Sequence, residues 1–245
     1  MKRPNSKTFN PAKLLLLTPI LLSSLMLTFL SINEEAMYCD EVRRIKLPAP
    51  KYKGKVSVEE AIYLRKSIRQ YKNLPLKIEQ VGQLLWSACG VTIDGVTGPT
   101  RAYPSAGAIY PIKIYLVVNN VLGLEKGIYL YIYNSHELQL IKKGDFRGKL
   151  LEASYNQFMV SEASINIILT GLYNRVISRY GERGERRYIC MDVGHAGQNI
   201  HLQCVSLGLG TVVIGAFDDV RVAQILELQP DEKPLYIMPV GVPKR

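Results

Sequence analysis

The feature that most constrains this chain is an uncharged run near its beginning. Residues 14–32 contain no charged side chain, and four cations, Lys2, Arg3, Lys7 and Lys13, precede them. As a helix these nineteen residues would span about 28 Å, close to the hydrocarbon thickness of a bilayer. A segment of this kind is a membrane anchor or a signal peptide, so we expect residues 1–39 to stand apart from the folded domain.

We expect an anchor that stays on the protein. The apolar part of a signal peptide usually has about 7–15 residues and ends at two small residues, whereas this run is longer and ends at Asn33-Glu34-Glu35. The preceding cations should stay cytoplasmic, which puts the domain on the outer side of the cytoplasmic membrane. The alternative is export after signal cleavage. Residues 40–55 are predicted to be a linker, and residues 56–245 the folded domain.

Composition indicates a globular domain with a moderate excess of positive charge. Hydrophobic residues make up 47% and charged residues 21% of the 245, which excludes general disorder, and four cysteines are too few for a disulfide scaffold. The net charge of +10 suits an anionic ligand, a membrane surface or nucleic acid. Because the tyrosines do not alternate with Lys and Arg, we expect no nucleic-acid partner.

The pattern of apolar residues predicts an α+β layered fold. A capping box begins at Ser57 and starts a first helix, which is expected to continue to the region of residues 65–69. The uninterrupted apolar run at residues 165–172 is typical of a buried central strand. The other predicted segments are a helix at 77–89, a long loop at 91–111, strands at 112–118, 127–133 and 137–141, helices at 149–159 and 187–209, a short strand at 212–214, a helix at 220–228 and a last strand at 235–242.

Two sets of cations are candidate anion sites. Arg65 and Arg69 are four residues apart, which on a helix puts both on one face, and Ser67 adds a hydroxyl beside them. Two guanidinium groups and a hydroxyl form a suitable phosphate clamp; the alternative is a solvated cationic helix end. Lys244 and Arg245 follow the last strand directly, and the alternative for them is a frayed basic tail.

Two further segments favour close approach of a planar ligand. Residues 103–111 place small residues between two prolines, which stiffens a loop and leaves its backbone accessible, although a plain loop would look the same. Gly215 and Ala216 follow a strand and precede a helix, so their N–H groups could meet a polar ring edge; the alternative is a tight strand-to-helix turn. Cys190, His195 and His201 are spaced by five and six residues on one helix, which scatters them, so we expect no metal site.

In their order and spacing these segments resemble the nitroreductase-like flavoprotein superfamily, and within it the SagB/ThcOx-type dehydrogenase branch. The resemblance implies a three-layer α+β fold, with a mixed sheet flanked by helices, and FMN bound at the interface of a homodimer. The matching motifs are Arg65-Lys-Ser-Ile-Arg-Gln-Tyr71, Pro104-Ser-Ala-Gly-Ala-Ile-Tyr-Pro111, residues 179–188, Gly194-His-Ala-Gly-Gln-Asn199, and Leu207-Gly-Leu-Gly210 followed by Ile214-Gly-Ala-Phe-Asp-Asp219.

The resemblance also implies roles for single residues. Arg65, Ser67 and Arg69 would hold the FMN phosphate and ribityl chain, and Lys244 or Arg245 would complete the phosphate site. Pro104, Ser105 and Gly107 would come from the partner subunit and line the isoalloxazine ring, while Gly215 and Ala216 would direct N–H groups at its N5 and O4 edge.

One position departs from the branch. Azole-forming members use a Lys-Tyr pair for proton removal, and the matching residues here are Arg179 and Tyr180. An arginine keeps its proton and cannot act as a general base, so Tyr180 remains as the catalytic candidate. We expect an FMN-dependent oxidoreductase that transfers hydride between FMN and a small or peptidic substrate, with NAD(P)H as a candidate donor. The alternatives are a non-catalytic flavin-binding module and a membrane-tethered interaction module.

Overall fold

A computed structural model describes residues 43–95 and 98–244. The predicted anchor or signal segment, residues 1–39, and the cation Arg245 lie outside the described residues. Within the described part of the chain, the helices are all too short or too polar to cross a membrane.

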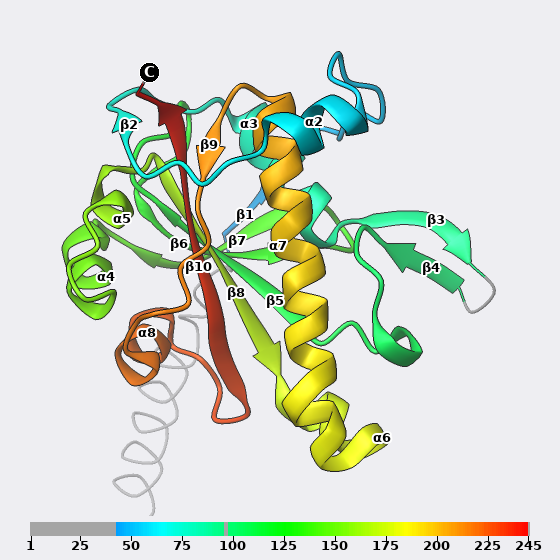
Figure 1. Ribbon diagram of the computed structural model, residues 1–245. Coiled ribbons are helices and arrows are strands. Elements are labelled where there is room, and N and C mark those ends of the chain that lie inside the picture. The colour runs from blue at the N-terminus through cyan, green and yellow to red at the C-terminus, as the bar shows by residue number, and fades with distance from the viewer. Residues whose placement is uncertain (1–42, 96–97, 245) are drawn as a thin grey trace, which may run out of the picture. The chain divides into compact units, whose positions relative to one another are not determined.

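An antiparallel sheet forms the centre of the domain (Figure 1). Its strands follow the order β1-β7-β6-β5-β8-β10-β2, and β9 pairs with β10 beside this path. An isolated bridge between Leu76 and Val121 is parallel. The strands are β1 (Arg44–Lys46), β2 (Tyr71–Lys72), β5 (Ile112–Val118), β6 (Gly127–Ile132), β7 (Glu137–Lys143), β8 (Ile165–Leu172), β9 (Gly210–Thr211) and β10 (Glu232–Pro243).

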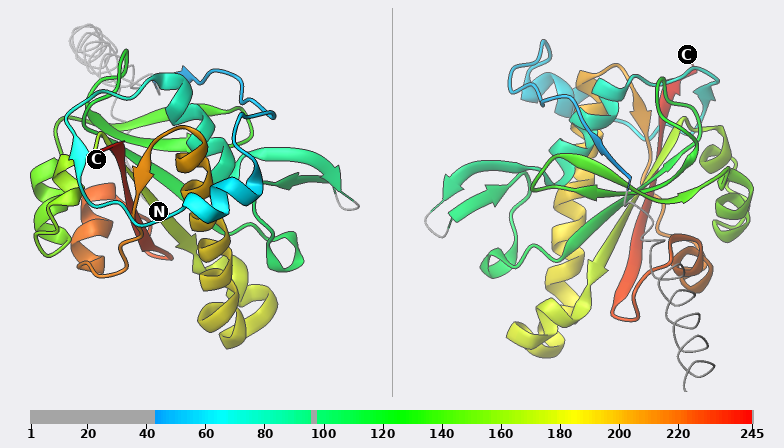
Figure 2. Two further views of the ribbon diagram at one scale, coloured as in Figure 1. Left: turned by 45° about the horizontal axis from the view of Figure 1, so that its top comes forward. Right: turned by 180° about the vertical axis from the view of Figure 1, so that it is seen from behind.

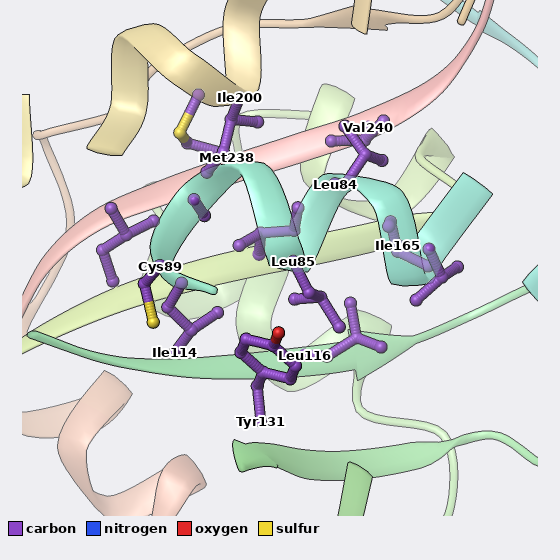
Figure 3. Packing of buried hydrophobic residues seen from close by; sticks show 14 of the residues in the cluster. Leu84, Leu85, Cys89, Ile114, Leu116, Tyr131, Ile165, Ile200, Met238 and Val240 are labelled. Carbon is purple, nitrogen blue, oxygen red and sulfur yellow. The ribbon is translucent and has the colours of Figure 1, made fainter. Parts of the chain in front are cut away.

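Helices cover both faces of the sheet, which confirms the predicted three-layer α+β fold (Figures 1 and 2). On one face α3 and α7 pack over a core that includes Leu84, Ile114 and Ile200 (Figure 3). On the other face α4, α5 and α8 enclose a second core. The helices are α2 (Val58–Leu64), α3 (Ile78–Cys89), α4 (Arg147–Ala153), α5 (Met159–Glu162), α6 (Tyr173–Arg183), α7 (Ile189–Ser206) and α8 (Asp219–Leu226).

The central strand β8 occupies the range predicted for it. Its register pairs it with β5 on one side and β10 on the other. Ile167 faces the core under α3 and α7, and Ile168 faces the opposite core. Since successive strand residues point to opposite faces, a strand covered on both sides must be apolar throughout, which is the pattern seen in the sequence.

Four predictions of local structure within the domain were wrong. The helix predicted at 149–159 is interrupted, since α4 ends at Ala153 and α5 begins at Met159. The first helix ends at Leu64, because its last turn stops at Arg65 with ψ 122. Residues 91–111 are not one loop: β3 (Val91–Gly95) and β4 (Gly98–Arg101) form a hairpin that projects from the body, and a 3₁₀ turn follows at Ala106–Ala108 (Figure 1). The predicted strand at 212–214 is reduced to a bridge between Ile214 and Ile237, next to β9.

The segment expected to be a linker contains structure. Residues 44–46 form β1, which pairs with β7 at the edge of the sheet. Gln83 of α3 then holds the following chain: it accepts from the Lys51 N–H at 2.8 Å and donates to the Lys51 carbonyl at 3.0 Å. The chain before the first helix is therefore tied to the domain at two places.

Candidate functional site

Three segments that are far apart in the sequence lie side by side at one end of the sheet. The Ile68 N–H donates to the Thr211 carbonyl at 2.9 Å, and the Lys244 N–H donates to the Gln70 carbonyl at 3.0 Å. Residues 65–70 therefore run between β9 and the end of β10. This arrangement brings the two predicted sets of cations, 65–69 and Lys244, to the same place.

Arg65, Ser67 and Arg69 lie on extended chain, not on a helix face as predicted. On extended chain, successive side chains point to opposite sides. Ile68 points inward and packs on Gly210, where an added Cβ would lie 2.7 Å from Ile68 Cβ. Ser67 and Arg69, its neighbours, are exposed, and Arg65 is partly exposed. Because residues two apart on extended chain share a side, the three predicted ligands can still face one anion.

Arg65 lies close to a buried histidine on α7. The pKa of His201 falls from 6.5 to about 4, first because the side chain is buried and second because of the Arg65 charge. His201 is 7% exposed. It is therefore neutral near pH 7 and adds no cation to the Arg65 region.

Lys244 has an acidic neighbour. Its Nζ lies 3.9 Å from Glu162 Oε2, and both side chains are partly exposed. An exposed pair at this distance is weak, so the ammonium group remains available to an anion. Lys244 lies at the same end of the sheet as Arg69.

Gly215 and Ala216 form the exposed turn between Ile214 and α8. The Ala216 carbonyl accepts from Gln157 Nε2 at 2.8 Å, which fixes the turn. The N–H groups of both residues lack a hydrogen-bond partner in the described part of the chain. Two exposed donors at a fixed turn fit the polar edge of a flavin ring.

The loop before β5 is fixed to the start of α7. Ser105 Oγ donates to Asp192 Oδ2 at 2.6 Å and accepts from the Tyr110 N–H at 3.0 Å. Asp192 is 3% exposed, and burial raises its pKa while the Ser105 hydrogen bond opposes that rise. Because the hydroxyl of Ser105 is already donated to Asp192, Ser105 can serve a ligand only as an acceptor.

Gly107 lies against Tyr180 within the same chain. Gly107 has φ 60, and a Cβ there would lie 2.5 Å from the Tyr180 hydroxyl and 2.9 Å from Arg179 Cζ. Arg179 Nη1 also donates to the Gly107 carbonyl at 3.3 Å. The structure thus brings together the catalytic candidate and the loop, with Pro104 exposed beside them.

The two groups of predicted residues lie near different turns of α7. Arg65 neighbours His201, whereas Ser105 contacts Asp192. Nine residues of helix separate these contacts, which is about 14 Å along the axis. The separation agrees with a site in which the loop of one chain meets the cations of another.

A cavity lies apart from these residues. It measures about 750 Å³ and lies between residues 48–58, α3 and α7, with Tyr52, Trp86 and Asn199 among its lining. The predicted flavin residues are absent from this lining. Tyr52 and Trp86 pack with ring centroids 5.4 Å apart. This cavity is therefore separate from the residues that the motifs select.

Sequence reasoning missed two parts of the site. Asp192 lies within a helical pattern, and no local signal connects it with Ser105, 87 residues earlier. The helix α6, which carries Tyr180, was not predicted because Val176 is its one buried residue. The signal that could have found α6 is its charge: Arg175, Arg179 and Arg183 recur at intervals of four residues, which is a helical spacing.

Comparison with known proteins gives a consistent result. A model described as the nitroreductase family matches residues 62–242. A Methanocaldococcus jannaschii protein named as a nitroreductase is 39% identical over 76% of this chain and 91% of its own length. The trifolitoxin-processing protein TfxB of Rhizobium leguminosarum is 30% identical over 53% of this chain, which matches 36% of TfxB. A Ralstonia eutropha structure described as a nitroreductase is 27% identical, with a TM-score of 0.72, and covers 83% of this chain and 90% of its own.

Proposed function

The chain belongs to the nitroreductase family, as its motifs indicated, and from this we propose that it is an FMN-dependent oxidoreductase. In this proposal hydride passes between bound FMN and a small or peptidic substrate. One observation carries it: residues 65–70 are bonded to β9 and to the end of β10, which gathers Arg65, Arg69 and Lys244 at one end of the sheet. The exposed N–H groups of Gly215 and Ala216 follow β9 along the chain.

The residues present fit FMN. Arg65, Arg69 and Lys244 would neutralise the phosphate dianion, and the hydroxyl of Ser67 would add a hydrogen bond. The N–H groups of Gly215 and Ala216 would hold the polar edge of the ring. Arg245 remains a candidate for the same phosphate. FMN would supply the hydride-accepting and hydride-donating centre, and the chain would bind and orient it.

We propose that two copies complete the site. Of the seven residues of α2, Ala61 is buried, while Ile62 is 57% and Tyr63 87% exposed. A helix that exposes apolar side chains is expected to be covered by a partner. In a homodimer the partner's loop, with Pro104, Ser105 and Gly107, would line the ring held by the cations of the first chain.

Tyr180 is proposed as the proton donor or relay. Arg179 stacks near its ring, with Cζ 5.6 Å from the ring centroid, and holds the Gly107 carbonyl. An arginine stays protonated, so Arg179 orients the loop and does not remove a proton. Azoline oxidation of the kind that needs a lysine base is therefore disfavoured. The relation to TfxB, a protein named for trifolitoxin processing, supports a peptidic substrate as one form of the proposal.

Membrane attachment and an outer location rest on residues 1–39 and remain predictions. NAD(P)H as electron donor is also a proposal.

The phosphate site can be tested by the double change Ser67→Ala and Arg69→Ala, with Lys149→Ala on α4 as a control for an exposed cation outside the predicted site. We expect the double variant to purify without flavin and to dissociate more readily in analytical ultracentrifugation, while the control keeps both properties. If the double variant keeps its flavin and its dimer, the assignment of the phosphate site is wrong.

A further inference from the structure

The chain beside Tyr180 is unusually rich in arginine. Five arginines and two glutamates lie between residues 175 and 187, and all five arginines are exposed. The segment covers α6 and a π-helical turn, Gly184–Tyr188, that leads into α7. In Figure 1 it lies at the end of α7 that is remote from α2.

Most of these arginines lack an acidic partner. Arg186 pairs with Glu182, and Glu185 lies 4.0 Å from Lys233. Among the described residues, Arg175, Arg179, Arg183 and Arg187 form no ion pair. The cations near the β1 edge of the sheet differ, because they are matched with carboxylates: Arg43 with Glu125, Lys126 with Asp145 and Lys142 with Glu227.

The backbone bends where the unpaired cations gather. Gly181 has φ 56 and ψ −147, which interrupts α6. After this bend, Arg183, Arg186 and Arg187 line a hollow of about 240 Å³ together with Glu182. Glu182 neutralises Arg186 alone, and like charges one turn apart, as at Arg183 and Arg187, destabilise a helix modestly. An anion bound between Arg183 and Arg187 would remove this repulsion. A π-helical turn often marks a functional position.

The hollow lies close to the reacting groups of the proposed site. Gly184 packs so tightly that a Cβ there would lie 3.0 Å from Tyr180 Cβ. Tyr188, which follows Arg187, meets the Tyr180 ring edge-on with centroids 4.9 Å apart. The same strip of chain therefore carries the proton donor, the loop contact through Arg179, and the cationic hollow.

We infer that this hollow binds a carboxylate group carried by the substrate, and so selects anionic substrates. Guanidinium groups bind carboxylates through two parallel hydrogen bonds, which fixes orientation as well as charge. The inference deepens the proposed function and rests on it for the position of the reacting group. The substrate must carry a negative charge that reaches Arg183 and Arg187 while the reactive part of the substrate lies at Tyr180.

Calorimetric titration of the full-length protein with 4-nitrobenzoate and with 4-nitrobenzamide tests this. The two probes share the nitro group and differ in charge. We expect the carboxylate to bind about tenfold more tightly, and added salt to weaken that preference. The double change Arg183→Gln and Arg187→Gln should abolish it. A matched control, Arg43→Gln and Arg44→Gln, removes the same charge at the distant β1 edge and should leave it intact.

Equal affinities for the two probes, or no binding of either, would overturn the inference. An unchanged preference in the Arg183→Gln and Arg187→Gln variant would also overturn it. So would loss of the preference in the Arg43→Gln and Arg44→Gln control, because the effect would then follow net charge. The flavin content of each sample separates this result from the proposed function. A preference for the carboxylate in a protein that takes up no FMN would support the hollow and contradict the oxidoreductase.

Discussion

Ser105 donates a hydrogen bond to Asp192 over 2.6 Å, and this contact fastens the loop before β5 to the first turn of α7. The loop needs a restraint, because Gly107, Ala108 and Tyr110 all have positive φ. For residues other than glycine this region is unfavourable and persists only where surrounding contacts impose it. Among the described residues, no cation is bonded to Asp192. Its structural task therefore explains why this carboxylate is buried.

Replacement of Asp192 tests that task. Asp192→Ala leaves the Ser105 hydroxyl without its acceptor and should lower the free energy of unfolding by about 1–3 kcal/mol. Asp192→Asn keeps an acceptor oxygen and should cost less. Urea unfolding of both variants measures the difference. If both variants lose the same free energy of unfolding, the side-chain oxygen of the asparagine does not accept the Ser105 hydrogen bond.

Gly107 should tolerate no side chain. Gly107→Ala adds a Cβ at φ 60, 2.5 Å from the Tyr180 hydroxyl, so both backbone strain and displacement of Tyr180 are expected. Gly123→Ala is the matched control, since Gly123 has φ 75 but open space around a Cβ. We expect about 1 kcal/mol of destabilisation for the control and a clearly larger loss, with loss of turnover, for Gly107→Ala. Similar values for the two would remove the argument for the Tyr180 contact.

Tyr180→Phe should separate catalysis from binding. The phenyl ring keeps its contact with Tyr188, so the variant should fold and retain flavin. Loss of the proton donor should lower kcat about 100-fold, measured in steady-state assays with equal flavin content. Tyr188→Phe, which changes the other ring of the pair, should have little effect. A Tyr180→Phe enzyme with normal kcat would assign proton transfer to another group.

The stability of the fold should depend on His201 below neutral pH. Its pKa is about 4 in the folded protein and 6.5 normally. The unfolded chain therefore binds the proton more tightly than the folded chain. The stability that neutral His201 contributes to the fold is fully present above pH 6.5 and is lost as the pH falls from 6.5 to about 4. Denaturant titrations should show this slope in the wild type and a weaker one in His201→Asn. Identical slopes would mean that His201 is as accessible to protons folded as unfolded.

The central sheet could be predicted and the site only in part, for one physical reason. The strand β8 is covered on both faces, so burial dictates the identity of nearly every residue and the pattern is readable. The β3–β4 hairpin projects from the body (Figure 1), and no core imposes a period on its sequence. The loop at residues 103–111 stood out by its small residues and prolines, and the resemblance to the family selected Ser105 and Gly107 within it. Their partners Asp192 and Tyr180 come from distant elements.

The end of the first helix shows the same limit. The sequence pattern predicts that the helix continues through Arg69. In the structure the Ile68 N–H instead donates to the Thr211 carbonyl, and the Ile68 side chain packs on Gly210. Both contacts reach more than a hundred residues along the chain. Residues 65–69 lie near Lys244, but extended chain, and not the expected helix face, groups their cations.

The most direct test of the account is the visible absorption spectrum of the purified full-length protein, recorded without oxygen before and after addition of NADPH, with the released cofactor identified by mass. We predict an oxidised flavin spectrum, FMN as the cofactor, and bleaching when a competent donor is added. A spectrum that persists with NADPH would keep FMN and make the protein's own substrate the donor. A folded, colourless protein that cannot be loaded with FMN would contradict the account.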